Sequence, residues 1–143
     1  MKIDETPEED YEQVKIEQVG LIDPMTGAMI LKSLDGAEFH ITAFSAEVAT
    51  HIANFIDQKR EELPTIYNMF ENMCEENEVL LVKVKIYETG GIFRATLYFT
   101  GRKEFLLRNY RASDAIALAT FYNVPILVRR DLLHKPQTKT LEK

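Results

Sequence analysis

Cysteine is nearly absent from this 143-residue sequence, since Cys74 is the only one, and tryptophan is missing altogether. A single cysteine excludes a disulfide within the chain and any zinc site built from several thiolates. No apolar run approaches the roughly 18 residues that a membrane-spanning helix needs. The first residues, Met-Lys-Ile-Asp-Glu, also lack the apolar segment of a secretion signal. We therefore expect a cytoplasmic protein that makes no contact with a membrane.

The sequence also lacks the best-known catalytic patterns. It contains no glycine-rich phosphate loop, no His-Glu-x-x-His zinc motif and no Ser-His-Asp order. What remains is an ordinary globular composition, with 45% hydrophobic and 28% charged residues. The length is sufficient for one domain with a substantial core and too short for two ordinary domains.

Basic residues are scarce in the first half of the chain and plentiful in the second. Residues 1–78 contain five Lys or Arg against 18 Asp or Glu, a net charge of −13. Residues 79–143 contain 12 against five, a net charge of +7. The overall charge of −6 argues against a protein covered in nucleic-acid-binding surface. The division indicates either a basic binding face beside an acidic region or, as we prefer, two halves that attract each other.

The spacing of apolar residues predicts an α+β fold, with a mainly antiparallel or mixed sheet of about seven strands and three helices. Ser45, Thr65 and Ser113 can each cap the start of a helix, and Asn123 can end the third helix in the left-handed conformation. Alternation predicts strands at about 11–21, 28–34, 79–88, 92–100, 104–110 and 125–128, with a short strand through Phe39 and Ile41.

Two local patterns add detail to this prediction. Asp23-Pro-Met-Thr-Gly27 predicts a tight turn, in which Gly27 would supply a positive φ. In the second helix, Ile66, Phe70, Met73 and Cys74 are expected to share one apolar face, which favours a buried, inert thiol over a nucleophile.

Each half of the sequence repeats the order strand, strand, strand, helix, which suggests an internally duplicated unit. Residues 1–10 are predicted to be an acidic flexible tail, since they carry five acidic residues and no apolar run. Residues 11–133 would form a single domain, and residues 134–143 a second flexible tail.

Several segments together resemble the bifunctional nuclease domain family. They run in order from about residue 12 to 133, and the most specific is Arg111-Ala-Ser-Asp-Ala-Ile-Ala-Leu-Ala119. The others are Val19-Gly-Leu, Asp23-Pro-Met-Thr-Gly27, Asp35-Gly36, Ile41-Thr-Ala-Phe-Ser-Ala-Glu-Val-Ala49 and Val124-Pro-Ile-Leu-Val128. The resemblance implies a compact α+β fold that often self-associates, and an ability of some members to cleave both DNA and RNA.

The sequence departs from this family's pattern at three places. The family commonly has Thr-His-Asp before the second helix, where this chain has Thr65-Ile66-Tyr67. An aspartate two positions before the shared arginine is Asn109 here, and a proline before the shared serine is Ala112. Losses of a histidine and two carboxylates are of the kind that removes metal ligands or a general base.

The residues best suited to phosphodiester chemistry are Asp114 and Glu47 as carboxylate ligands for Mg²⁺ or Mn²⁺, with Arg111 as a phosphate clamp. His51 follows Glu47 by four residues and would lie on the same helix face. A plainer interpretation is that Ser113 caps its helix, Asp114 complements the helix dipole and pairs with Arg111, and Glu47 pairs with His51. If approximate two-fold symmetry relates the halves, Glu47 and Asp114 would converge on one site.

The hairpin of the second half combines basic and aromatic residues, namely Lys83, Lys85 and Tyr87 on one strand and Arg94, Thr96 and Tyr98 on the next. Cations beside aromatic rings hold single-stranded nucleic acid without reading its sequence, so Lys83, Lys85, Arg94 and Tyr98 are candidate contacts. The exposed side of an ordinary antiparallel sheet favours the same residue types.

Two functions therefore remain open. The first is a metal-assisted nuclease acting on DNA or RNA with low sequence preference. The second is a non-catalytic module, either nucleic-acid-binding or assembling as a homo-oligomer, that has lost the histidine and aspartate positions of the family.

Overall fold

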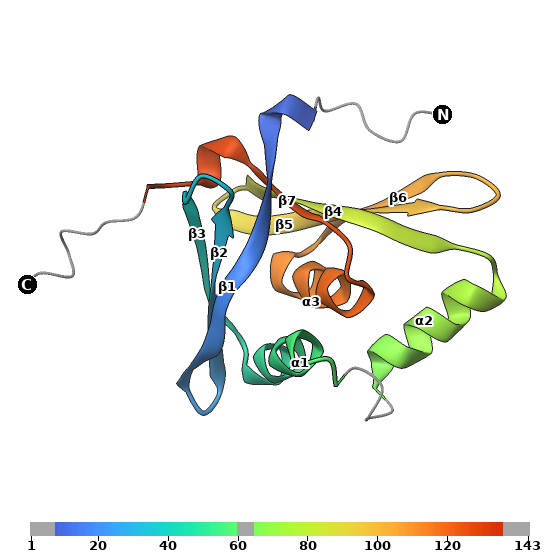
Figure 1. Ribbon diagram of the computed structural model, residues 1–143, viewed down its shortest axis with the longest axis horizontal. Helices are drawn as coiled ribbons and strands as arrows, with labels where there is room; N and C mark the ends of the chain where they lie inside the picture. Colours follow the sequence, from blue (N-terminus) through green and yellow to red (C-terminus); the bar gives the residue numbers. More distant parts are fainter. Residues whose placement is uncertain (1–7, 60–64, 136–143) are drawn as a thin grey trace, which may run out of the picture.

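A single curled sheet of seven strands wraps around two of the three helices (Figure 1). The computed structural model describes residues 8–59 and 65–135. The strands are β1 (Tyr11–Asp23), β2 (Thr26–Ser33), β3 (Glu38–Ser45), β4 (Leu80–Thr89), β5 (Ile92–Thr100), β6 (Phe105–Arg111) and β7 (Ile126–Arg129). The helices are α1 (Ala46–Ile56), α2 (Ile66–Glu76) and α3 (Ala112–Tyr122), with short 3-10 helices η1 (Glu8–Asp10) and η2 (Arg130–Leu132).

The sheet consists of two antiparallel sets of three strands joined by β7. Its strand order is β3-β2-β1-β7-β4-β5-β6, and β7 runs antiparallel to β1 and parallel to β4. Phe39 of β3 and Phe93 of β5 meet with ring centroids 4.9 Å apart, although several strands separate them in the sheet order. This contact shows how far the sheet curls, and the α+β prediction of about seven strands and three helices is confirmed.

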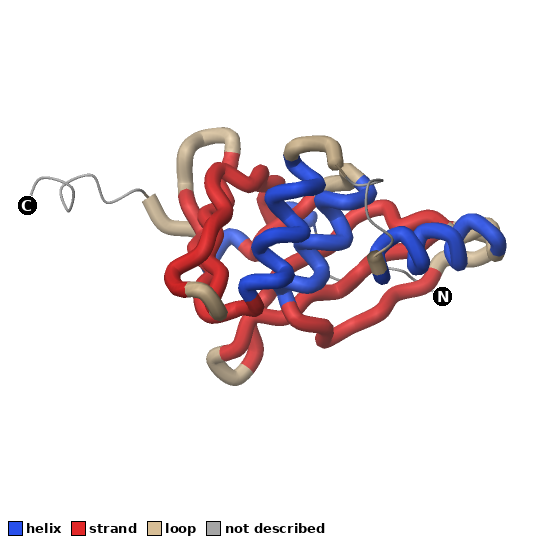
Figure 2. Tube along the Cα trace, turned by 90° about the horizontal axis from the view of Figure 1, so that it is seen from below, coloured by secondary structure: helices blue, strands red, loops and turns tan. Residues whose placement is uncertain are grey.

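Helices α1 and α3 pack against each other on the concave side of the sheet (Figure 2). Helix α3 is apolar almost all round, which is the composition of a helix buried on most sides. Ile52 of α1 and both Ile116 and Phe121 of α3 have no exposed surface. The core therefore lies between the sheet and these two helices.

The two halves share backbone geometry as well as element order. Each half places a residue with positive φ three positions before the first residue of its helix: Ala43 at 65° before α1 and Asn109 at 69° before α3. The N-cap residues are also alike, with φ/ψ of −63°/136° at Ser45 and −61°/136° at Arg111. The strand-strand-strand-helix unit thus recurs with the same connection from strand to helix.

Most of the expected helix ends are confirmed. The Ser45 hydroxyl accepts a hydrogen bond from the Glu47 N–H, Thr65 forms a capping box with Asn68, and Asn123 adopts the left-handed conformation at φ 62°. The expected cap at Ser113 is wrong. Helix α3 begins one residue earlier, its N-cap is Arg111 without a side-chain cap, and Ser113 is buried at the second helical position.

The expectation for Gly27 is also wrong. The turn between β1 and β2 contains only Pro24 and Met25, and Gly27 lies within β2 without a positive φ. A Cβ atom built at Gly27 would lie 2.8 Å from the Ala49 Cβ and 2.8 Å from the Phe44 ring. Glycine is therefore required there by the close approach of α1 and not by backbone conformation.

The two expected tails fall mostly outside the described residues. Of the described part, Glu8–Asp10 forms η1, and His134 exchanges two backbone hydrogen bonds with Glu38, of 2.6 and 2.8 Å. The expectation of two flexible tails stays a prediction. In the portion of the chain that the structure describes, no helix has the length and apolar character needed to cross a bilayer.

Candidate functional site

Glu47 and Asp114 lie in the first turns of α1 and α3, one position apart when the N-caps Ser45 and Arg111 are aligned. Glu47 is the second residue of α1, and Asp114 is the third residue of α3. Both carboxylates are exposed, and Glu47 has 83% of its side chain in solvent. Each can complement the positive end of its helix dipole while remaining accessible to a ligand.

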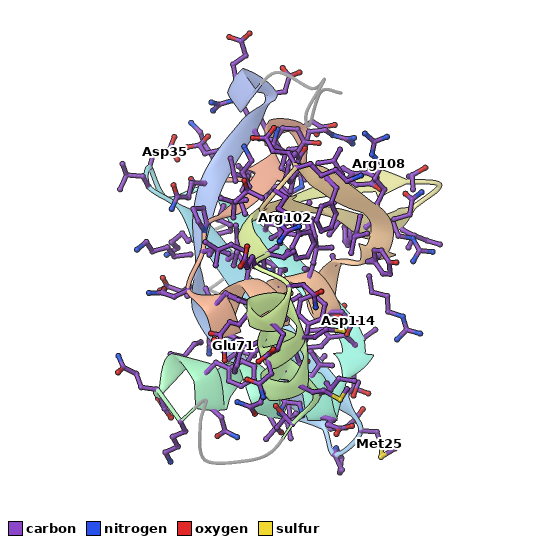
Figure 3. The ribbon with its side chains drawn as sticks, turned by 90° about the vertical axis from the view of Figure 1, so that its right-hand side faces the viewer. Met25, Asp35, Glu71, Arg102, Arg108 and Asp114 are labelled. Carbon is purple, nitrogen blue, oxygen red and sulfur yellow. The ribbon has the colours of Figure 1, made fainter. Side chains whose placement is uncertain are left out.

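Tyr67, the second residue of α2, lies in the electrostatic field of both carboxylates. Burial raises the pKa of its phenol, and the negative charges of Asp114 and Glu47 contribute further, to about 12. Both carboxylates therefore act on the same phenol, and burial remains the larger cause of its raised pKa. In the view of Figure 3, Asp114 lies below Arg108 of β6 and above Met25 of the β1–β2 turn.

His51 connects Glu47 to Tyr67. Its Nε2 atom lies 3.7 Å from Glu47 Oε2, and its ring centroid lies 5.2 Å from that of Tyr67 in an edge-on arrangement. Only 18% of the His51 side chain is exposed. The imidazole is therefore held by its neighbours, which include Phe55 at a centroid distance of 6.0 Å.

A small aromatic cluster packs beside the Glu47–His51 pair and includes the ring of Tyr67. Phe55 of α1 and Phe121 of α3 lie 5.1 Å apart, and Tyr67 contacts both, at 5.0 and 6.1 Å. These rings join all three helices at one place. The pairing Glu47–His51 and the phenol of Tyr67 thus rest on a rigid apolar base, as a site that must hold its geometry requires.

Arg111 and Arg94 form a second charged feature next to Asp114. They are directly opposite each other in the β5–β6 register, so their side chains start from the same face of the sheet. Neither arginine makes an ion pair with another residue in ranges 8–59 and 65–135. The expected Arg111–Asp114 pair is therefore not formed, and two adjacent guanidinium groups remain available for an anion.

The expectation of an exposed basic face on β4 and β5 is only partly met. Lys85 is 1% exposed and Tyr98 is 4% exposed. The Lys85 ammonium lies 4.8 Å from the centre of the Tyr11 ring and 5.2 Å from that of Tyr98, so aromatic rings cover it. The prediction that Lys85 and Tyr98 face solvent is wrong, whereas Lys83 and Arg94 are partly exposed.

The site's capacity for a metal ion follows from its donor atoms. The described residues include no group of three or more His, Cys, Asp or Glu side chains arranged to hold a metal. A cage closed by protein ligands alone is therefore not formed in this part of the chain. Mg²⁺ commonly binds through one or two carboxylates, with waters and substrate phosphates completing its shell, and Glu47 and Asp114 suit that mode.

Tyr67 is the member of the site that sequence reasoning missed as a functional residue. The sequence does contain one signal, since the resemblance places an aspartate at this position. The structure adds that the charges of Glu47 and Asp114 both act on its phenol.

Comparison with known proteins identifies the family of the chain. The family model described as the bifunctional nuclease domain matches residues 29–140, most of the chain. The match starts after residue 27, so the segment Asp23–Gly27, on which part of the resemblance rested, lies outside the matched region. No curated protein sequence matches the chain. On the strength of the family match and the fold, the chain belongs to the bifunctional nuclease domain family.

Proposed function

We propose that this protein is a metal-assisted nuclease that cleaves DNA and RNA with little sequence preference. The observation that carries the proposal is the position of Tyr67, whose phenol lies in the field of both Glu47 and Asp114. Two carboxylates from the first turns of α1 and α3 therefore act on one phenol. Membership of a nuclease-named domain family supports the same reading.

Glu47 and Asp114 would hold Mg²⁺ or Mn²⁺ together with a phosphate of the substrate. The bound ion would activate a water molecule and neutralise negative charge that develops on the phosphate. Because the protein offers two carboxylates and not a closed cage, we expect the ion to bind more tightly when nucleic acid is present.

His51 is the candidate proton acceptor of the site. Glu47 lies 3.7 Å from its Nε2 atom, and the Tyr67 and Phe55 rings fix the imidazole plane. A pKa of about 12 keeps the Tyr67 phenol protonated at neutral pH, so it can donate a hydrogen bond to a phosphate oxygen. The His51 imidazole and the Tyr67 phenol are held in place by neighbouring protein side chains, without a metal ion.

Arg111 and Arg94 would bind the phosphates that flank the cleavage point. Two guanidinium groups on directly opposed strand positions repel each other, and an anion between them relieves that repulsion. Contacts of this kind recognise the sugar-phosphate backbone and not the bases, which would allow cleavage of both DNA and RNA.

The test is cleavage of single-stranded DNA and RNA by the purified full chain with Mg²⁺ or Mn²⁺. Asp114→Asn and Glu47→Gln should each slow cleavage by about 100-fold or more, because each removes a charged ligand of the ion. Glu104→Gln is the matched control, since Glu104 is an exposed acid outside the site. Equal cleavage by Asp114→Asn and Glu104→Gln would contradict the proposal.

A non-catalytic nucleic-acid-binding module is the second candidate, favoured by Tyr67 itself. Tyrosine stands where the resemblance places an aspartate, which leaves the site with two carboxylates. Salt-sensitive binding without cleavage would select this function. In that case Arg94→Gln and Arg111→Gln should still weaken binding, whereas Asp114→Asn should strengthen it by removing a negative charge.

A further inference from the structure

Large apolar side chains are exposed on the outer side of α2 and on the β1–β2 hairpin. On α2, Ile66 and Met73 are 65% and 56% exposed, so the expectation that they share the buried face of Cys74 is wrong. On the hairpin, Leu21 is 54% exposed, and Met25 in the turn is 79% exposed. The hairpin also has an open strand edge, which restricts what can cover its apolar residues.

The edge of β1 that faces away from β2 is open over most of its length. β2 pairs with β1 from Val14 to Asp23, whereas β7 pairs with β1 from Tyr11 to Val14. In the part of the chain that the structure describes, residues 15–23 have no strand beside them on this second edge. The N–H and C=O groups along such an edge are a template for pairing with a further strand.

The open edge is symmetric in its spacing about Val19. In the ladder with β2, the partners of Lys15, Val19 and Asp23 are, in the same order, Lys32, Met29 and Thr26. Lys15 and Asp23 are thus three ladder positions from Val19 on either side, and each half contains one register shift. Ile16 and Leu21 are likewise two ladder positions from Val19. The strand therefore keeps the same spacing when it is turned about a two-fold axis at Val19.

Pairing about this axis brings complementary side chains together. Lys15 of each copy then lies opposite Asp23 of the other, which makes two ion pairs. Both residues are exposed, and Lys15 has no ion pair with another described residue. Ile16 of each copy lies opposite Leu21 of the other, so the exposed Leu21 side chain is covered. Opposite charges and apolar groups thus match in a single register.

A hollow of about 320 Å³ lies where the open edge meets β7. It is lined by β1, by Ile56 at the end of α1, and by residues between 119 and 126, which join α3 to β7. In the two-fold arrangement, β1 of the other copy ends at Asp23, opposite Lys15 at the rim of this hollow. The turn that follows brings Met25 of that copy to the hollow, and a methionine side chain is flexible enough to fill it.

We propose that two copies of this chain associate through the open edge of β1 and form one continuous sheet, with Met25 of each copy in the hollow of the other. The length of the edge favours a second copy over an unrelated strand. β7 occupies the edge up to Val14, and β1 ends at Asp23, so the hairpin of one copy fits the gap on the other. An unrelated strand would have neither this length nor the match between Lys15 and Asp23.

Sedimentation equilibrium of the purified full chain measures this association. We expect a dimer whose dissociation constant rises by about tenfold or more in Lys15→Asp, because like charges then replace both ion pairs. Asp23→Asn should also weaken the dimer, although it keeps the side-chain oxygen that accepts the Met25 N–H at 2.8 Å. Lys103→Asp is the matched control, since Lys103 is exposed between β5 and β6. A chain that stays monomeric, or a dimer that Lys15→Asp leaves unchanged, would overturn the proposal.

Cysteine cross-linking tests the position of the axis. A residue on the axis lies opposite its own copy, with Cβ atoms about 4.5–5.5 Å apart, so Val19→Cys should form a disulfide-linked dimer on mild oxidation. Leu34→Cys is the matched control, since Leu34 is fully exposed in the β2–β3 turn, outside the proposed contact. The native Cys74 is buried and should not react. Dimers that Val19→Cys does not cross-link, or equal cross-linking of Leu34→Cys, would contradict this arrangement.

The hollow has its own test. Met25→Gln should raise the dissociation constant of the dimer by about tenfold or more, because Met25 is the apolar anchor that enters the hollow. Leu34→Gln, which changes an exposed apolar residue of the other turn, should leave it unchanged. Equal dissociation constants for these two variants would overturn the assignment of Met25 to the hollow.

Discussion

Tyr67 belongs to the candidate site, although a tyrosine at this position would not by itself indicate one. A tyrosine at the start of a helix is ordinarily a packing residue, and this one does pack against Phe55 and Phe121. Its phenol nevertheless lies near two carboxylates from different helices, which raise its pKa further than burial would. At the scale of single residues, the ionisation of Tyr67 therefore reports whether both carboxylates act on its phenol.

We predict that the pKa of Tyr67 falls from about 12 toward 10 in the combined variant Glu47→Gln and Asp114→Asn. It should stay above 10, because burial is the larger cause. A titration of labelled tyrosine carbons by NMR measures this change, with Glu104→Gln as the control. An unchanged Tyr67 pKa in the combined variant would show that the carboxylates lie elsewhere.

The same shift has a consequence for stability at high pH. A pKa that is raised in the folded state favours folding below the unfolded value of 10, and this contribution is lost as the pH rises toward 12. The free energy of unfolding therefore decreases as the pH rises from 10 to about 12.

At the scale of elements, glycine at position 27 determines how closely β2 approaches α1. A built Cβ atom would meet Ala49 and Phe44 at 2.8 Å. Gly20 in β1 offers a matched comparison, because a Cβ atom there meets nothing within 4 Å. Neither glycine has a positive φ, so the two positions differ only in packing.

We predict that Gly27→Ala lowers the free energy of unfolding by about 1–3 kcal/mol, because it forces α1 away from the sheet. Gly20→Ala should leave the stability unchanged or raise it by about 0.4–1 kcal/mol, since it restricts the unfolded chain. Urea denaturation of both variants measures the difference. A similar change in the two would mean that the contact with α1 does not limit position 27.

At the scale of the whole molecule, the sequence was a good guide to the elements and a poor guide to what covers them. Alternation predicted β4 and β5 because their inner residues, such as Val84 and Leu97, belong to one core. The same alternation predicted that Lys85 faces solvent, because alternation indicates on which face of the sheet a residue lies. It does not indicate whether another part of the chain covers that face. Tyr11, 74 positions away in the sequence, covers Lys85.

The individual acidic residues of the site could be predicted from the sequence, whereas their position relative to Tyr67 could not. Glu47 and Asp114 are visible as acids in the first turns of helices, although alignment of the two N-caps places Asp114 one residue further along its helix than Glu47. Tyr67 belongs to a third helix outside the repeat, so no spacing in the sequence connects it to them. Helix α3 likewise begins at Ala112, so its N-cap falls on Arg111, which has no side-chain oxygen to accept a hydrogen bond, and Ser113 lies inside the helix.

The most direct measurement of the central claim, that Glu47 and Asp114 serve one ion, is a Mn²⁺ titration followed by amide NMR. The full chain would be studied with a nuclease-resistant phosphorothioate oligonucleotide, which supplies the phosphates. We predict that the amide signals of the first turns of α1 and α3 broaden together at the same low Mn²⁺ concentration. Either Glu47→Gln or Asp114→Asn should abolish broadening in both turns, whereas Glu104→Gln should not. Broadening of one turn without the other, or of neither, would contradict the claim.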